Sequence, residues 1–146
     1  MRKQQFSATI HAPKEKVWQV LWSEETYPAW TAAFAEGSRA ETDGWKQGTT
    51  VRFLDGRGSG MISRVAENRP NEFMSFEHLG VIHNGVEDTE SEEVKKWKGS
   101  KENYYLEERD GNTELKVEMD ISEEWKDYFL KTWPRALENI RKLSEK

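Results

Sequence analysis

The sequence predicts an α+β fold in which a curved antiparallel sheet of about six to seven strands wraps around one long C-terminal helix. Hydrophobic residues alternate with polar ones through most of the chain, which is typical of half-buried strands. The period changes to three and four residues after Ile121, which is typical of an amphipathic helix. Consecutive strands with short turns favour an antiparallel meander, and the helix covers the face that such a sheet must bury.

The chain begins with one strand and two short helices. Residues Gln4–His11 alternate as a strand, and Pro13 ends it and provides a good first position for a helix. Ser23 can cap a second short helix over Glu24–Trp30. The apolar residues of these elements are Phe6, Ala8, Ile10, Val17, Trp18, Leu21, Trp22, Tyr27, Trp30 and Phe34.

From about Gly37 the period of two predicts the remaining strands, with turn dipeptides such as Asp43-Gly44 between them. The segment Val81–Lys101 is interpreted as an exposed, highly charged excursion with a short helix over Ser91–Trp97. The predicted strands are Arg39–Thr42, Thr49–Leu54, Met61–Ala66, Glu72–Leu79, Glu102–Glu108 and Thr113–Ile121.

The long helix is predicted over Ser122–Leu143, with Ser122 as its N-cap. Pro134 lies well inside it and predicts a bend near Leu130–Trp133, because proline removes a backbone donor and clashes with the preceding turn. We expect this helix to close one side of a cavity. Its apolar face carries Trp125, Tyr128, Phe129, Trp133, Ala136, Leu137, Ile140 and Leu143.

Composition excludes several classes of function. The chain has no cysteine, so it has no disulfide, no thiolate nucleophile and no Cys-ligated zinc. A net charge of −5 argues against a general nucleic-acid binder. No stretch approaches the ~18 apolar residues of a membrane span, and the N-terminus lacks the apolar run of a signal peptide. We therefore expect one cytoplasmic domain over residues 1–146.

Candidate catalytic groups are few. Glu77 and Glu102 lie on predicted strands, and either carboxylate could serve as an acid or base if it faced an apolar interior. His78 is interpreted as an ordinary core or surface histidine, because adjacent strand residues point to opposite faces and do not converge on a metal. With no Ser-His-Asp, Cys-His or metal constellation evident, the sequence predicts neither an enzyme nor a metal or cofactor site.

Two further motifs are interpreted as ordinary loops. The Gly-rich run Asp55–Gly60 lacks the Lys-Ser/Thr of a P-loop and precedes a strand, so it predicts a hairpin turn. The acidic cluster Glu87–Glu93 does not have the ligand spacing of an EF-hand, so it predicts a solvated loop.

The aromatic residues give the strongest hypothesis of a binding site. They could line a pocket in which Tyr104 and the indole N–H groups orient the polar end of a ligand. Complete filling of the core by the same rings is the alternative. The candidate ligand-binding residues are Trp30, Phe34, Phe53, Phe76, His78, Tyr104, Trp125, Phe129 and Trp133.

Five segments resemble the START-related, Bet v 1-like (SRPBCC) superfamily, and within it the family similar to the C-terminal domain of activators of the Hsp90 ATPase. The most specific are "AP-x-E-x-VW" at Ala12–Trp18 and the Trp133-Pro134 pair followed by Leu137. The acidic insertion at Glu87–Glu93 is longer than in that family. The segments are Phe6–Trp30, Gly48–Gly60, Phe73–Gly80, Gly111–Asp120 and Tyr128–Leu143.

The resemblance implies the helix-grip fold, whose members bind or process lipids, sterols, polyketides and hormones between the sheet and the long helix. The first hypothesis is therefore that the chain is a domain that binds a small apolar or amphipathic molecule and does not catalyse a reaction. An Hsp90-type chaperone-interaction domain is the second hypothesis. The third is a cyclase- or hydratase-like enzyme that uses Glu77, His78 or Tyr104.

Overall fold

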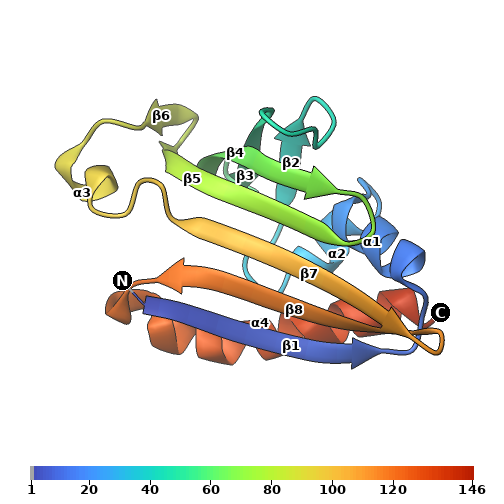
Figure 1. The fold of residues 1–146 in the computed structure, drawn as a ribbon. Helices are drawn as coiled ribbons and strands as arrows, with labels where there is room; N and C mark the ends of the chain where they lie inside the picture. Colours follow the sequence, from blue (N-terminus) through green and yellow to red (C-terminus); the bar gives the residue numbers. More distant parts are fainter. Residues whose placement is uncertain (1) are drawn as a thin grey trace.

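The computed structural model describes residues 2–146, which form one eight-stranded sheet and four helices (Figure 1). The α+β prediction is confirmed, with one strand more than the predicted maximum. The elements are β1 (Arg2–Ile10), α1 (Lys14–Trp22), α2 (Tyr27–Thr31), β2 (Arg39–Thr42), β3 (Thr50–Leu54), β4 (Gly60–Arg69), β5 (Phe73–His83), β6 (Val86–Asp88), α3 (Glu92–Lys95), β7 (Lys101–Arg109), β8 (Asn112–Ile121) and α4 (Glu123–Ser144).

The sheet is antiparallel throughout, in the order β1-β8-β7-β5-β4-β3-β2, and β6 pairs with β5 off this path. The first and the last strands of the chain lie side by side, because Arg2–Ile10 pairs with Thr113–Ile121. Two register shifts interrupt the pairing of β4 with β5, one of them between Ile62 and Ser63. Such irregularities bend a strand and re-aim its side chains.

Helices α1, α2 and α4 lie on one face of the sheet, here called the concave face (Figure 1). Each strand sends alternate residues to this face, so Met74, Phe76 and His78 of β5 are buried there together. Helix α4 runs beside β1 and packs against it and against α1 and α2. The hydrophobic core therefore lies between the three helices and the concave face.

The segment between β5 and β7 corrects the predicted boundaries. Strand β5 continues past Leu79 to His83, and Val81–His83 pairs with the short strand β6. The predicted excursion thus starts as a hairpin around Asn84 and Gly85, both of which have positive φ angles. The predicted short helix is confirmed as α3, whose Val94 N–H donates to the Ser91 hydroxyl.

Helix α4 changes in burial at Thr132, so we call residues 123–131 its first half and residues 132–144 its second half. Trp133, Ala136, Leu137 and Ile140 are buried in the second half, whereas Trp125 and Leu130 in the first half are exposed. Ser122 occupies the N-cap position, as predicted, but its side chain makes no capping hydrogen bond. The helix continues through Pro134 to Ser144, and the bend expected near Leu130–Trp133 stays a prediction.

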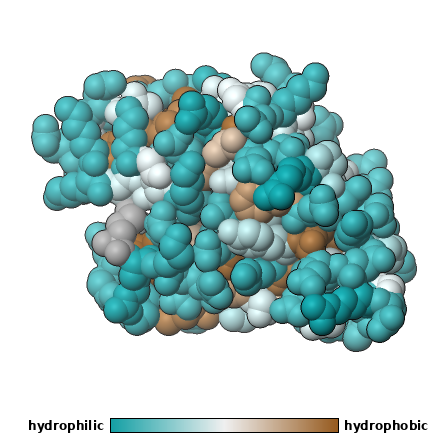
Figure 2. All heavy atoms as spheres, in the orientation of Figure 1, coloured by the Kyte–Doolittle hydropathy of each residue, from teal (hydrophilic) through white to brown (hydrophobic). Residues whose placement is uncertain are grey.

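Hydrophilic side chains cover most of the face seen in Figure 2, and hydrophobic atoms appear between them in small separate patches. Among residues 2–146, no helix has the length and the apolar character required to cross a bilayer.

A candidate binding site on the concave face

Four polar side chains lie in a line on the concave face. Ser63 comes from β4, His78 from β5, and Glu102 and Tyr104 from β7. The strand register brings them together, because Ser63 lies opposite His78 and Glu102 lies opposite Phe76, two residues before His78. We call these four residues the polar row. They are linked by consecutive hydrogen bonds across three neighbouring strands.

The hydrogen bonds of the polar row have a defined direction. The Ser63 Oγ and His78 Nδ1 atoms are 2.7 Å apart, and His78 Nε2 lies 3.2 Å from Glu102 Oε1. The Tyr104 hydroxyl donates to Glu102 Oε2. A carboxylate only accepts, so His78 donates to Glu102 from Nε2. Tyr104 and His78 therefore both donate to Glu102.

Most of the polar row is buried, but Glu102 is not completely enclosed. Ser63 is fully buried and Tyr104 is 2% exposed, whereas 18% of the Glu102 side chain is open to solvent. Burial, together with the neighbouring charge of Glu102, raises the pKa of the Tyr104 hydroxyl well above its usual value. The phenol therefore stays protonated and keeps donating to the carboxylate.

Tyr27, at the start of α2, brings a second phenol to the same region. Its ring is buried against Phe53 and Trp30, with ring centroids 6.2 and 5.4 Å away. Burial is the main cause that raises the pKa of its hydroxyl, and the charge of Glu102 adds to the effect. Within residues 2–146 this hydroxyl has no hydrogen-bond partner, so it is available to a bound molecule.

Most of the predicted aromatic residues gather around the polar row. Phe76 lies 5.1 Å from Phe53 and 6.1 Å from Tyr104 between ring centroids, and Trp133 lies 5.0 Å from Phe34. Trp30 lies 6.1 Å from Trp133, and Phe129 lies 6.5 Å from Phe34. Phe34, Phe53 and Phe129 are only half-buried.

Two of the predicted residues do not join this group. Glu77, a candidate acid or base only if it faced the interior, lies on the opposite side of the sheet, where it pairs with Arg64. Its neighbour His78 points inward, as strand alternation requires. Trp125 lies in the first turn of α4 with 52% of its surface exposed and contacts only one other ring, that of Tyr128.

Sequence reasoning missed Ser63 and Tyr27 as members of the site. Strand alternation gave a signal for Ser63, because it lies two residues before the buried Val65 on the same strand. Tyr27 was assigned only to an apolar helix face, and its hydroxyl was not considered. Only the tertiary structure brings Glu102 close enough to Tyr27 for its charge to act on the Tyr27 hydroxyl.

The chemistry available to the row is acid–base chemistry rather than nucleophilic attack. Ser63, His78 and Glu102 have the residue types of a hydrolytic triad, but Ser63 is fully buried, so a bound molecule does not reach its hydroxyl. Glu102 and the Tyr27 hydroxyl are the groups that a bound molecule can meet. Among residues 2–146, no group of three or more His, Asp or Glu side chains is arranged to hold a metal ion.

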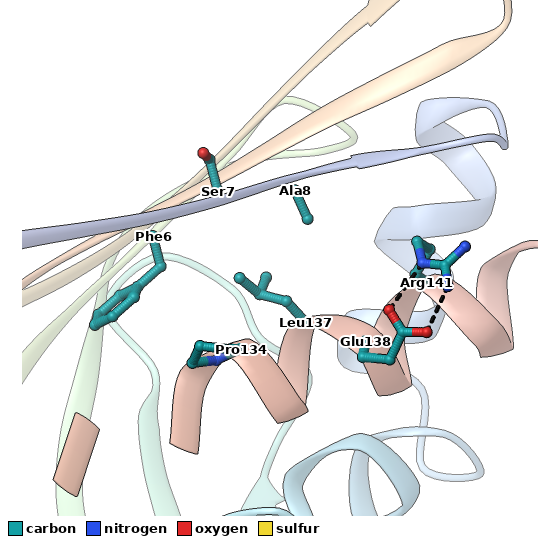
Figure 3. Close-up of a pocket in the computed structure, with 7 residues that line it drawn as sticks. All are labelled: Phe6, Ser7, Ala8, Pro134, Leu137, Glu138 and Arg141. Carbon is teal, nitrogen blue, oxygen red and sulfur yellow. Dashed lines mark hydrogen bonds and ion pairs between the residues drawn. The ribbon is translucent and has the colours of Figure 1, made fainter. Parts of the chain in front are cut away.

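Two hollows lie away from the polar row. One, of about 250 Å³, is lined by β1 and the second half of α4 (Figure 3). Figure 3 shows Phe6 and Ala8 directed toward the helix and Leu137 directed toward the strand, with the Arg141–Glu138 ion pair at one end. The other, of about 350 Å³, lies on the opposite face of the sheet around Phe73 and Tyr105.

Comparisons with known proteins identify the fold. No protein-family model and no curated protein matches the sequence. Solved structures do match: the Aha1 dimer from Colwellia psychrerythraea is 17% identical with a TM-score of 0.74, and the match covers 99% of this chain and 97% of that one. MLL2253 from Mesorhizobium loti is 16% identical with a TM-score of 0.73, and the match covers 97% and 96%.

CalU16 from Micromonospora echinospora is also similar, at 15% identity and a TM-score of 0.68 over 96% of this chain and 72% of that one. Likeness at such low identity establishes architecture, since one fold hosts many functions. The curved antiparallel sheet around a long C-terminal helix that these proteins share with this chain is the helix-grip fold.

Proposed function

We propose that this chain binds a small amphipathic molecule on its concave face, with the polar row holding the polar end and the aromatic rings holding the apolar end. The proposal rests on the hydrogen bonds that link Ser63, His78, Glu102 and Tyr104. His78 and Tyr104 both bond to the carboxylate of Glu102, and 18% of that side chain is open to solvent. Burying polar groups costs free energy, so a core with a purely structural role is more stable when it is built from apolar residues. Four buried or partly buried polar side chains in one row therefore favour a role in binding.

The half-buried rings supply the apolar part of this site. Phe34, Phe53 and Phe129 each have a ring partner but keep part of their surface open. Pockets for small molecules typically combine such apolar lining with a few well-placed polar groups. Glu102 and the free Tyr27 hydroxyl are those polar groups here.

A thermal-shift screen with fatty acids, sterols and aromatic polyketides tests the proposal. A molecule that binds the folded chain raises the melting temperature by mass action. Two Phe→Ala variants then locate the site, because Phe53 and Phe73 are both half-buried but lie on opposite faces of the sheet. Phe53→Ala should weaken binding and Phe73→Ala should not. If no compound shifts the melting temperature, or if Phe73→Ala has the larger effect, the proposal is wrong.

A second candidate function is interaction with an Hsp90-type chaperone, and an exposed apolar patch favours it. Trp125, Tyr128 and Leu130 on the first half of α4 are 52%, 38% and 40% exposed, and tryptophan is frequent at interaction hot spots. One of the structures with the same fold is described as an Aha1 dimer.

A pull-down of the host chaperone by the wild-type chain and by the Trp125→Ala variant tests this candidate function. Val86→Ala is the control, because Val86 is the other large hydrophobic residue exposed among those described and lies on β6. Retention by wild type and by the Val86 variant, with loss in the Trp125 variant, is expected. Equal retention of all three proteins, or of none, contradicts it.

A further inference from the structure

The carboxylate of the polar row has no lysine or arginine partner. Its contacts are the Tyr104 hydroxyl and His78 Nε2, and within residues 2–146 no lysine or arginine forms an ion pair with it. The nearby basic residues Arg64 and Lys101 belong to the other face, where Arg64 pairs with Glu77. A carboxylate gains free energy from a cationic partner where solvent is partly excluded.

A cluster of aromatic rings lies around Tyr104, the residue whose hydroxyl donates to this carboxylate. Trp22 lies 5.0 Å from Tyr104 and 5.4 Å from Phe76, measured between ring centroids, and Phe53 and Tyr27 extend the ring cluster. The faces of aromatic rings are negative and attract cations, most strongly where solvent is excluded. A carboxylate and several rings in one partly desolvated site therefore favour the same kind of partner.

We propose that the ligand of this site carries a protonated amine, which pairs with Glu102 while its apolar body packs against the surrounding rings. The inference rests on the proposed ligand binding and adds the charge class of the ligand to it. The amine supplies a positive charge that no lysine or arginine provides at Glu102, and the Tyr27 hydroxyl can bond to a second polar group. A carboxylate ligand meets repulsion at the same position.

Three probes of nearly equal shape test the charge class: 2-(1-naphthyl)ethylamine, 2-(1-naphthyl)ethanol and 1-naphthylacetate. Their dissociation constants for the full chain are measured by calorimetry at neutral pH and low salt. The amine is expected to bind at least about tenfold more tightly than the alcohol, with the acid weakest, because an opposite charge in a partly desolvated site is worth about 1.4 kcal/mol or more.

Glu102→Gln assigns that preference to one side chain, since the amide keeps the shape of the residue and removes the charge. In this variant the preference for amine over alcohol should fall below about threefold. Glu77→Gln is the matched control: it removes the same charge from a carboxylate on the opposite face, and it should leave the preference unchanged.

The outcomes separate this inference from the proposed function. If the alcohol or the acid binds as tightly as the amine, or if the preference survives in Glu102→Gln, ligand binding stands and the charge class is overturned. Failure of all three probes, together with failure of the lipid and polyketide screen, overturns both. If Glu102→Gln does not fold, the order of affinity of the three probes for the wild-type chain still tests the charge class of the ligand.

Discussion

The two halves of α4 have the same hydrophobic spacing and opposite surroundings. In the second half Trp133 contacts four aromatic rings, and its indole N–H lies 3.1 Å from the sulfur of Met119. In the first half the Trp125 ring pairs with one other aromatic ring among residues 2–146, that of Tyr128, and 52% of Trp125 is exposed. The helix period shows which side chains share a face, and the opposite element decides whether that face is buried.

This difference matters for the site because of where the polar row lies. Glu102 pairs with Met119, which is two residues before the end of β8, and α4 begins directly after that strand. Met119 also lies 3.1 Å from the Trp133 indole nitrogen, and Tyr104 lies 6.1 Å from the Trp133 ring, so the row is next to the point at which the buried part of α4 begins. We expect a ligand to approach Glu102 from the less covered, N-terminal side of Trp133.

Of the substitutions that test the difference between the two halves of α4, Trp133→Ala should lower the stability of the chain most. Removal of a fully buried indole from the contacts with Phe6, Trp30 and Phe34 should lower the free energy of unfolding by about 3–5 kcal/mol. Urea denaturation followed by circular dichroism measures it. A loss below about 1 kcal/mol would mean that the second half of α4 is not the anchored part.

Alkaline pH should destabilise the chain through the two phenols beside Glu102. The pKa values of Tyr27 and Tyr104 are raised above 10.0 in the folded state, so above that pH the unfolded chain releases protons that the folded chain retains. Stability is fully present below pH 10 and should fall by about 1.4 kcal/mol per pH unit for each tyrosine.

Urea unfolding from about pH 9 to 11 measures this slope, and Tyr104→Phe should lower it by the share of one tyrosine, about 1.4 kcal/mol per pH unit. Tyrosinate absorbance on the folded protein provides the check. Ionisation of all four tyrosines before the chain unfolds contradicts the burial of Tyr27 and Tyr104.

Tyr104→Phe at neutral pH should have a smaller effect. The ring keeps its contacts with Trp22 and Phe76, but Glu102 loses a charge-assisted hydrogen bond inside the site. A loss of about 1.5–3 kcal/mol in unfolding free energy is expected. An unchanged value would indicate that water replaces the phenol completely and that the Glu102 end of the row is more open than its burial suggests.

Trp125→Ala should have the smallest effect on stability, within about 0.5 kcal/mol, because the side chain is 52% exposed and leaves no cavity. The same urea titration measures it. A loss similar to that of Trp133→Ala would show that both halves of the helix are packed alike in solution, and the comparison would fail.

Much of the fold was predictable from the sequence because the two periods are local properties. Arg39–Thr42 was predicted with its observed bounds, and Glu77 and His78 face opposite sides of β5, as alternation predicts. The site was harder to predict. That Ser63 lies opposite His78 depends on the register shift after Ile62, which no local pattern reveals. Glu77 and Glu102 look alike in the sequence, and only the pairing of β5 with β7 separates their faces.

The most direct test of the account is to locate a bound amine by NMR. Backbone and side-chain shifts are followed during titration with 2-(1-naphthyl)ethylamine. The account predicts that the largest changes fall on Ser63, His78, Tyr104 and the first half of α4, with Phe6 and Leu137 in the hollow beside β1 unchanged. Changes confined to that hollow, or to Phe73 and Tyr105 on the opposite face of the sheet, would contradict it.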